Sequence, residues 1–475
     1  MKPLRPASLP PRPNLWAALG PGVVWLALAQ GSGELVWWPY CIAKYGLGFL
    51  ALLAPACFLQ WPLNVAIGRY TAFTGESIWQ GFVRLHRGFA FGLWLLMAAS
   101  FLWFGGFASA GGEAIASLTG VGTPVLWGFV TVAIFFLALI FSKAAYTLIE
   151  RFMSVVAITT VVGLAWATMH PTVRARIPEF TLGVLGFDHT LAHPWDPKDA
   201  TKLLTAITFA GLGGFWTLFY SSWLREKGTG MAARMGRVTS PVTGKGEFIE
   251  DAGFVPREEP ELAAHARGWV RFLWLDAGVG VIGNLATTFA TCLLAYAVLL
   301  PKGLVPTEQQ LVTLQAEFFA VSWGETGRRV FLVVAAAFLA DTWLATVDAV
   351  AHTHTEMSRE FIPKLAKRWD YRTTYYGWVV VLTIVSCVTM AAKSPQALIL
   401  TSAVIGFVGT VLYSSALVVL NYRLLPRLLP AEVAPRPAGK WLLIAVVSCY
   451  VGLAVAYLVQ VAPQVLGLFR AASPG

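Results

Sequence analysis

Eleven apolar runs, each long enough to cross a lipid bilayer as an α-helix, dominate this sequence of 475 residues. A membrane-spanning helix needs about 20 predominantly apolar residues. A soluble domain carries about 25% charged residues, whereas only 13% of this chain is charged and 57% is hydrophobic. The sequence therefore predicts an all-α polytopic membrane protein. The runs cover approximately 15–44, 47–70, 90–117, 123–142, 151–169, 200–224, 271–300, 327–352, 374–392, 396–422 and 440–468.

The basic residues predict how the chain is oriented in the membrane. A net charge of +10 could indicate binding to nucleic acid, but the basic residues fall in the loops between apolar runs and form no patch interleaved with aromatic rings. Cytoplasmic loops of membrane proteins are enriched in Lys and Arg. Most of the 35 basic residues share one side of the membrane if the N-terminus is cytoplasmic. We therefore expect a cell-membrane protein with a cytoplasmic N-terminus and no nucleic-acid partner.

Two of the runs contain glycine clusters about halfway along their length. Residues 31–34 read Gly-Ser-Gly-Glu, and residues 211–214 read Gly-Leu-Gly-Gly. A helix interruption at the centre of the bilayer leaves backbone polar groups without partners, so it is tolerated where it lines a site. Paired interruptions are typical of inverted-repeat transporters that bind substrate at the midplane. Close helix packing around small residues is the alternative explanation.

Glu34 is a carboxylate at membrane depth, where charged groups are costly and usually functional. We expect it to contact a substrate or coupling ion or to take up a proton; the alternative is a structural pair with a neighbouring helix. It is also a weak candidate metal ligand. The residues that we expect to bind substrate are Gly31, Ser32, Gly33, Glu34, Gly211, Gly213, Gly214 and Trp216.

The eighth run carries three ionisable residues on one helix face. Asp341, Asp348 and His352 are spaced by seven and four residues, which places them on the same side of a helix. Carboxylates and an imidazole inside a membrane suit a proton relay or a cation path. A polar stripe lining a helix interface near the cytoplasm is the alternative interpretation.

Several motifs in the first half of the chain resemble the Nramp family of proton-coupled divalent-metal transporters. Residues 19–22 read Leu-Gly-Pro-Gly and are followed, after eight residues, by the cluster at 31–34. Similar matches occur at 72–77, 146–151 and 218–222. The resemblance covers about residues 1–225. It implies a LeuT-type fold, with two inverted repeats of five helices and one extra helix, and a transport function.

The family's metal ligands are not kept in this chain. The aspartate and asparagine of the family motif align with Gly31 and Glu34, and its Met-Pro-His motif aligns with residues 214–216. A dehydrated divalent ion needs several ligands, so Glu34 alone is a poor metal site. Glu113 keeps an acidic position of the family, and we expect it to take part in proton transfer. The aromatic ring of Trp216 suits an organic cation instead.

The resemblance divides the chain into consecutive parts. We expect a cytoplasmic tail at 1–14, a first repeat at 15–169, an extracellular loop at 170–199, a second repeat at 200–422 and a last helix at 440–468. Within the second repeat, residues 225–270 form a cytoplasmic loop, which we interpret as a flexible connection or a docking segment.

Three hypotheses for function remain open at this stage. The first is a secondary transporter of a small cationic solute, with a divalent metal ion as one candidate and protons as the coupling ion. The second is a transporter of a small organic solute such as an amine or amino acid, and the third is a sensor or scaffold that transports nothing. The sequence has no nucleotide loop, nucleophile motif or metalloprotease motif, so we expect no enzymatic activity. We also expect no cofactor, and a monomer whose partners are the bilayer and a small solute.

Overall fold

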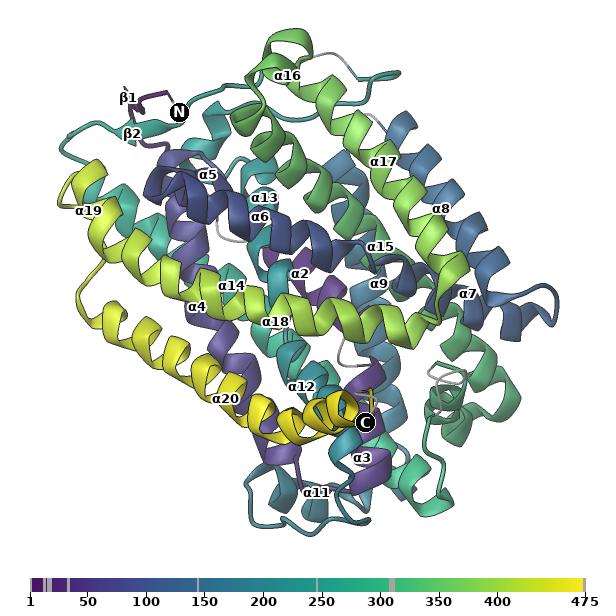
Figure 1. Ribbon diagram of the computed structural model, residues 1–475. Helices are drawn as coiled ribbons and strands as arrows, with labels where there is room; N and C mark the ends of the chain where they lie inside the picture. The colour runs from purple at the N-terminus through teal and green to yellow at the C-terminus, as the bar shows by residue number, and fades with distance from the viewer. Residues whose placement is uncertain are drawn as a thin grey trace.

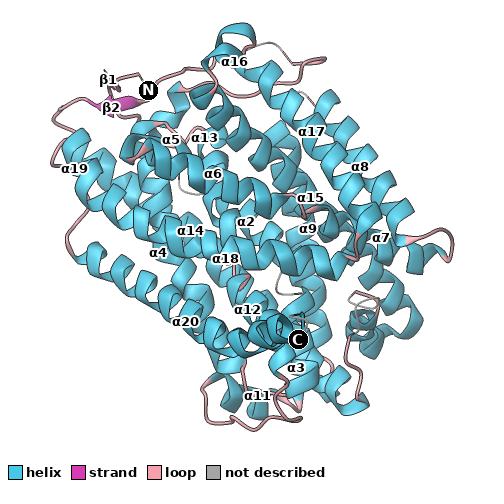
Figure 2. Ribbon diagram, viewed as in Figure 1, coloured by secondary structure: helices cyan, strands magenta, loops and turns pink. Residues whose placement is uncertain are grey.

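The computed structural model describes residues 2–11, 14, 19–31, 35–142, 145–244, 247–306 and 312–472. Most of this is helix (Figure 2). Within these ranges, nine helical segments are long and apolar enough to cross a membrane. They contain α4 (Leu53–Thr74), α6 (Arg87–Phe101) with α7 (Gly105–Thr119), α8 (Pro124–Phe141), α9 (Ala145–Thr168), α14 (Leu262–Leu294), α15 (Glu317–Phe361), α17 (Tyr371–Ala392), α18 (Pro395–Val419) and α20 (Ala438–Ala472).

The two remaining expected spans, 15–44 and 200–224, each appear as a pair of shorter helices. The first pair is α2 (Pro21–Ala29) and α3 (Leu35–Tyr45); residues 32–34, which include Ser32, Gly33 and Glu34, lie outside the described residues. The second pair is α12 (Ala200–Thr208) and α13 (Phe219–Lys227), with a 3-10 turn, η4 (Gly214–Leu218), between them. The second interruption falls at the glycine cluster of residues 211–214 that predicts it, whereas most of the first cluster lies outside the described residues.

Short elements connect the long helices. These are α5 (Ile78–Leu85), α10 (Pro171–Arg174), α11 (Ile177–Val184), α16 (Pro363–Arg368), α19 (Leu425–Leu428), the 3-10 turns η2 (Leu50–Leu52), η3 (Pro197–Asp199), η5 (Gly230–Arg234), η7 (Leu300–Lys302) and η8 (Leu314–Ala316), and the π-helical turns η6 (Ala295–Leu299) and η9 (Leu420–Leu424).

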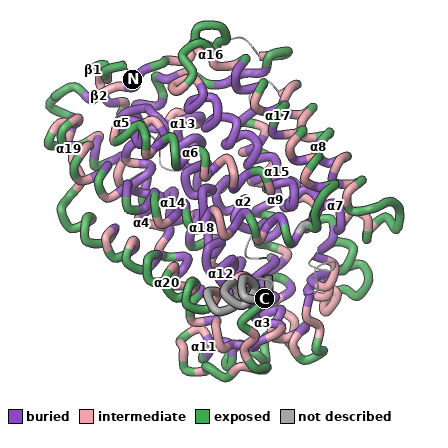
Figure 3. Tube along the Cα trace, in the orientation of Figure 1, coloured by how far each residue is buried: buried purple, intermediate pink, exposed green. Residues whose placement is uncertain are grey.

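The interrupted helices lie in the interior of the bundle (Figure 1). Buried residues concentrate around α2, α13 and the middle of α15, while α8, α17 and α20 present exposed residues on the outside (Figure 3). We call the end of the bundle that carries β1 and α16 the N-terminal face, and the end that carries α11 the opposite face. The positive-inside expectation assigns the N-terminal face to the cytoplasm.

The N-terminal segment is attached to the loop between α13 and α14. Strand β1 (Arg5–Ala7) pairs in parallel with β2 (Phe254–Pro256). An ion pair joins Arg5 to Glu250, and the Ser8 hydroxyl donates to Glu259 Oε1 at 2.6 Å. This loop therefore docks on the N-terminal segment, whereas the sequence left a flexible connection and a docking segment as alternatives.

Glycine is required at the second interruption because the chain turns sharply after α12. Gly213 has a φ of 58°, a conformation that L side chains rarely adopt. A Cβ atom placed there would lie 1.7 Å from the carbonyl oxygen of Thr208. Neither the backbone conformation nor the close approach allows a side chain.

The change Gly213→Ala is expected to destabilise the protein. The left-handed conformation alone costs about 1–2 kcal/mol for a residue with a Cβ atom, and the clash with Thr208 displaces backbone in addition. Thermal unfolding in detergent should show a clearly lower midpoint. The matched control is Gly92→Ala on the outside of α6, where an added Cβ meets nothing within 4 Å. Equal midpoints for the two variants would contradict the assigned turn.

Candidate functional site

The end of α2 lies directly against α15. Gly31 follows the end of α2, and a Cβ atom there would lie 1.9 Å from Thr342 Oγ1 and 2.7 Å from the carbonyl oxygen of Phe338. The Thr342 hydroxyl also lies 3.5 Å from Asp341 Oδ1. The end of α2 therefore lies against the turn of α15 that carries Asp341.

Several buried polar side chains around the two interruptions have no hydrogen-bond partner among the described residues. They include both polar atoms of Gln30 at the end of α2, the hydroxyl of Thr208 at the end of α12, and Oδ2 of Asp341. All three residues are at most 3% exposed. Leaving buried polar groups unpaired is costly. These residues therefore place polar groups at the ends of α2 and α12 and beside Thr342.

The second interruption is held by polar contacts from α4 and α18. A Cβ atom on Gly211, which has a φ of 108°, would lie 2.9 Å from Gln60 Cγ. The Tyr413 hydroxyl donates to the carbonyl oxygen of Gly214 at 2.9 Å, and the Thr217 hydroxyl donates to Gln60 Oε1 at 3.0 Å. Tyr413 thus replaces a backbone partner that a continuous helix would supply, and Gln60 holds the side chain of Thr217.

Trp216 packs in an aromatic cluster beside the second interruption. Its ring centroid lies 4.7 Å from that of Phe101, 5.3 Å from Phe209 and 5.9 Å from Phe107, all edge to face. Its indole N–H donates to Thr346 Oγ1 on α15 at 3.0 Å. The ring is thus fixed against α15, one turn from Thr342, and its role in substrate binding stays a prediction.

A second group of polar residues lies along α15 toward the N-terminal face. His352 Nε2 lies 3.7 Å from both Asp348 Oδ1 and Glu226 Oε1, and His352 Nδ1 lies 3.2 Å from the Tyr371 hydroxyl. The Tyr375 hydroxyl donates to Asp348 Oδ1. The face predicted for Asp348 and His352 is therefore occupied by partners from α13 and α17.

This group continues to Glu356, the next acidic residue of α15. Glu356 forms a buried ion pair with Arg225 and accepts a hydrogen bond from Ser77. The Tyr371 hydroxyl lies 3.5 Å from Glu356 Oε1, so it bridges Glu356 and His352. We call this set the α15 network. Its members are Ser77, Arg225, Glu226, Asp348, His352, Glu356, Tyr371 and Tyr375.

The charges of the α15 network do not balance. It contains three carboxylates, Glu226, Asp348 and Glu356, each at most 9% exposed, but Arg225 is its one arginine or lysine. A buried carboxylate without a partner cation is strongly disfavoured. The Arg225–Glu356 ion pair leaves Glu226 and Asp348 with His352 as the titratable group between them.

The α15 network reaches a cavity that opens on the N-terminal face. This cavity has a volume of about 420 Å³, and its lining includes Arg225, Glu356 and Tyr371 together with Glu76 and Lys2. Water and ions on the N-terminal face thus reach Glu356 directly. The contacts described above lead from there to Asp348, two helical turns from Asp341.

Glu113 lies apart from this network. It is 7% exposed on α7. Its carboxylate accepts a hydrogen bond from the Thr313 hydroxyl at 3.4 Å and further ones from the backbone of Val312 and Thr313, in the segment before α15. Because Thr313 precedes α15, Glu113 is nearer the opposite face than Asp341. The helices that carry them are in contact, since a Cβ atom on Gly111 would lie 3.3 Å from Leu339 Cβ.

On the opposite face, Asp199 joins α3 to the start of α12. Its carboxylate accepts hydrogen bonds from the Tyr40 and Tyr45 hydroxyls at 2.9 and 2.7 Å and forms ion pairs with Lys44 at 2.6 Å and Lys202 at 2.9 Å. Burial by itself would raise the pKa of Asp199, but these donors outweigh it and lower the pKa to about 2. We call these five residues the opposite-face cluster.

Sequence reasoning missed several of these residues. Gln30, the unpaired polar residue next to Gly31, was detectable as an amide inside an apolar run. Asp199 and Arg225 border the apolar runs, and the ion pairs that they form across helices are visible in the structure alone. Glu34, the predicted metal ligand, lies outside the described residues. Within the described part of the chain, no three His, Cys, Asp or Glu side chains are grouped so that they could hold a metal ion.

No family model matches this chain, and no curated protein matches it by sequence. Solved structures do match. The manganese transporter of Eremococcus coleocola, in complex with an aromatic bis-isothiourea substituted compound, aligns with a TM-score of 0.65 and 15% identity over 97% of this chain and 89% of that one. A histidine-to-alanine mutant of that transporter aligns with a TM-score of 0.64 and 14% identity over the same shares.

These matches show that the chain shares the fold of an Nramp-type transporter. The predicted fold class, an all-α polytopic membrane protein of the LeuT type, is confirmed. The chain is a multi-pass membrane protein. Its division into repeats at 15–169 and 200–422 stays a prediction.

The opposite-face cluster predicts a pH dependence of stability. An Asp pKa of about 2 lies below the usual value of about 3.9, so the ionised carboxylate stabilises the folded protein above about pH 4. This stabilisation is lost as the pH falls toward 2.

Asp199→Asn should lower the unfolding midpoint at pH 7, and the difference from the wild type should shrink between pH 4 and pH 2.5. Asp188→Asn, a change at a partly exposed position in the same extramembrane region, is the control. A difference independent of pH would contradict the assigned ion pairs.

Proposed function

We propose that this protein is an Nramp-related secondary active transporter that moves a small cationic solute by alternating access, coupled to protons. The observation that carries the proposal is the approach of the end of α2 to the turn of α15 that carries Asp341. Gly31 lies against Thr342, and Asp341 beside it keeps an oxygen without a described partner. A buried carboxylate at this depth needs a cation or a proton.

The ends of the interrupted helices add to the preference for a cation. α2 ends at Ala29 and α12 ends at Thr208, so both helices direct their C-terminal ends into the interior. The C-terminal end of a helix carries about half a negative charge, and its last carbonyl groups are free to coordinate a cation. Gln30 and Thr208 provide side-chain oxygen atoms at the same two ends.

The α15 network supports proton coupling. Its excess carboxylates hold protons when no cation is near, and the cavity on the N-terminal face gives them access to solvent. Arrival of a cation at Asp341 would favour release of a proton by Coulomb repulsion. His352, held between Asp348 and Glu226, can pass such a proton toward Glu356.

Alternating access requires that one face opens while the other is closed. The opposite-face cluster ties α3 to the start of α12, and the Arg225–Glu356 ion pair ties α13 to α15 at the N-terminal face. Opening each face would break one set of contacts. The halves of the two interrupted helices then move separately around the site.

Two classes of solute remain, a divalent metal ion and a small organic cation, and each has an observation in its favour. The fold neighbour is a manganese transporter, which favours a divalent metal ion. The aromatic rings around Trp216 beside the second interruption favour a small organic cation, which aromatic faces attract. Both versions depend on Asp341.

Loss of the Asp341 charge is expected to abolish transport. Wild-type protein in liposomes with an inside-negative potential should produce a solute-dependent proton flux, measured with a pH-sensitive dye. Asp341→Asn should reduce the initial rate at least 10-fold, because neither the solute nor the proton then meets a carboxylate. Asp188→Asn, the same chemical change in a surface loop, should retain the wild-type rate. Wild-type flux in Asp341→Asn would remove the proposed role, and no flux with any cation in the wild type would favour the sensor hypothesis.

Calorimetry should separate the two versions of the solute. If the solute is a metal, titration of manganese or cobalt into the purified protein gives a binding heat that is lost in both Glu34→Ala and Asp341→Asn. If the solute is organic, small amines give the heat and manganese, cobalt and magnesium do not. Binding heat from manganese that persists in both variants would place the metal elsewhere and contradict the metal version.

A further inference from the structure

A basic cavity lies at the side of the bundle, near the N-terminal face and away from the interrupted helices. It has a volume of about 580 Å³ and is bounded by α4, α14, η9 and the segment before α20. Four arginines line it: Arg69, Arg267, Arg271 and Arg436. Glu432 is the one acidic residue in the lining, so the cavity carries a large positive excess.

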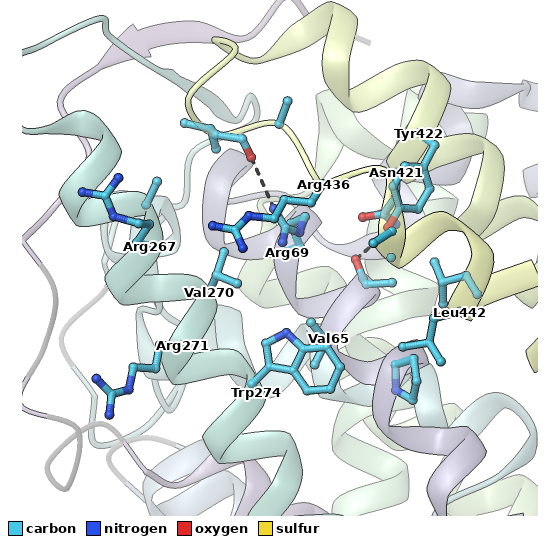
Figure 4. Close-up of a pocket in the computed structure, with 18 of the residues that line it drawn as sticks. Val65, Arg69, Arg267, Val270, Arg271, Trp274, Asn421, Tyr422, Arg436 and Leu442 are labelled. Atoms are coloured by element: carbon cyan, nitrogen blue, oxygen red, sulfur yellow. Dashed lines mark hydrogen bonds between the residues drawn. The ribbon is translucent and has the colours of Figure 1, made fainter.

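None of the four arginines forms an ion pair with a described carboxylate. Arg69, which is half-buried, donates a hydrogen bond to the carbonyl oxygen of Val433 at 3.3 Å. Arg436 lies close enough to Arg69 for their like charges to repel, and Figure 4 shows the two side chains above the same opening. Arg69 is half-buried and Arg436 is exposed, so the repulsion acts at the mouth of the cavity. An anionic ligand would relieve this repulsion.

The geometry favours a phosphate group as that ligand. Guanidinium groups bind phosphate through paired N–H donors. Arg69 and Arg436 lie close together, whereas Arg267 and Arg271 belong to α14 at the edge of the cavity and extend away from that pair (Figure 4). Asn421 and the ring of Tyr422 also line the cavity and add polar groups for the rest of a headgroup.

The cavity borders the surface that faces lipid. Along α14, the exposed residues change from Arg267 and Arg271 to Trp274, Leu275 and Ile282. The same change occurs at the start of α20, where exposed Trp441 and Leu442 follow Lys440. Trp is typical of the boundary between headgroups and hydrocarbon. The arginines therefore lie at the level of the lipid headgroups. The apolar surfaces of α14 and α20 continue from there toward the centre of the bilayer.

We infer that this cavity binds the headgroup of an anionic phospholipid from the leaflet at the N-terminal face. The phosphate binds the arginines, and the acyl chains lie on the exposed apolar surfaces of α14 and α20. A headgroup with two phosphates matches the positive excess best. Basic cavities between membrane helices on the cytoplasmic side are suited to such lipids. The bound lipid would join the start of α20 to α4 and α14. This inference is independent of the transported solute.

Native mass spectrometry of the purified full chain tests the inference. The probes are cardiolipin with two phosphates, phosphatidylglycerol with one, and zwitterionic phosphatidylcholine, each added to delipidated protein. The wild type should retain one cardiolipin most strongly, phosphatidylglycerol less strongly and phosphatidylcholine least. The double variant Arg271→Gln/Arg436→Gln should bind cardiolipin roughly 10- to 30-fold more weakly, since each basic residue near a membrane surface contributes to anionic lipid binding.

The matched control is Arg423→Gln/Arg427→Gln. It removes the same charge from two exposed arginines near the same face that do not line the cavity, and it should bind cardiolipin like the wild type. Equal weakening in both double variants would show nonspecific attraction and overturn the inference. If the first variant does not fold, the inference is tested on the wild type alone by comparing how strongly it retains the three lipids. Equal retention of all three overturns the inference.

A free anion is the remaining alternative source of the phosphate. Inorganic phosphate at millimolar concentration should neither raise the melting temperature of the wild type nor displace cardiolipin, while cardiolipin should raise the melting temperature. Stabilisation by inorganic phosphate that equals the effect of cardiolipin would assign the cavity to a soluble phosphate and overturn the lipid inference.

Discussion

Inside a bilayer, a backbone N–H or C=O group that leaves its helix finds no water to replace the lost partner. This constraint determines what surrounds the two interrupted spans of the protein. The carbonyl oxygen of Gly214 accepts a hydrogen bond from the Tyr413 hydroxyl of α18. Gln60 of α4 accepts a hydrogen bond from the Thr217 side chain and so holds the turn that follows the interruption. The end of α2 at Gly31 lies against Thr342 of α15. Helix α18 therefore supplies a backbone partner at the second interruption, and α15 brings Asp341 close to the end of α2.

The long helix α15 connects this central region to the N-terminal face. Its acidic residues belong to two environments: Asp341 lies among few polar groups, while Asp348 and Glu356 belong to a network with His352 and Arg225. The first environment suits binding of a cation, and the second suits storage and transfer of protons. The opposite-face cluster around Asp199 closes the other end of the bundle. A protein with polar contacts at both ends and unpaired polar groups between them has the features that alternating access requires.

The sequence predicts the elements of this architecture better than their contacts. Length and hydropathy were sufficient for the membrane spans, and the glycines at 211–214 were sufficient for the interruption of the second pair, because both signals are local. The ion pair between Arg225 and Glu356, residues 131 positions apart, depends on the packing of α13 against α15, which no local pattern encodes. The pairing of β1 with β2 and the convergence of Arg69 and Arg436 have the same origin. Trp216 was recognised from its aligned position, but the hydrogen bond to Thr346 that fixes its ring could not be derived from sequence.

Hydrogen–deuterium exchange of the protein in lipid nanodiscs tests the central claim that two helices separate inside the membrane to form a site. Amides at 29–34 and 209–214 should exchange much faster than those in the middle of α18, an uninterrupted helix at comparable depth, and a bound solute should slow them selectively. If both segments exchange as slowly as α18 with and without solute, the two spans are continuous, hydrogen-bonded helices, and the proposed site does not exist.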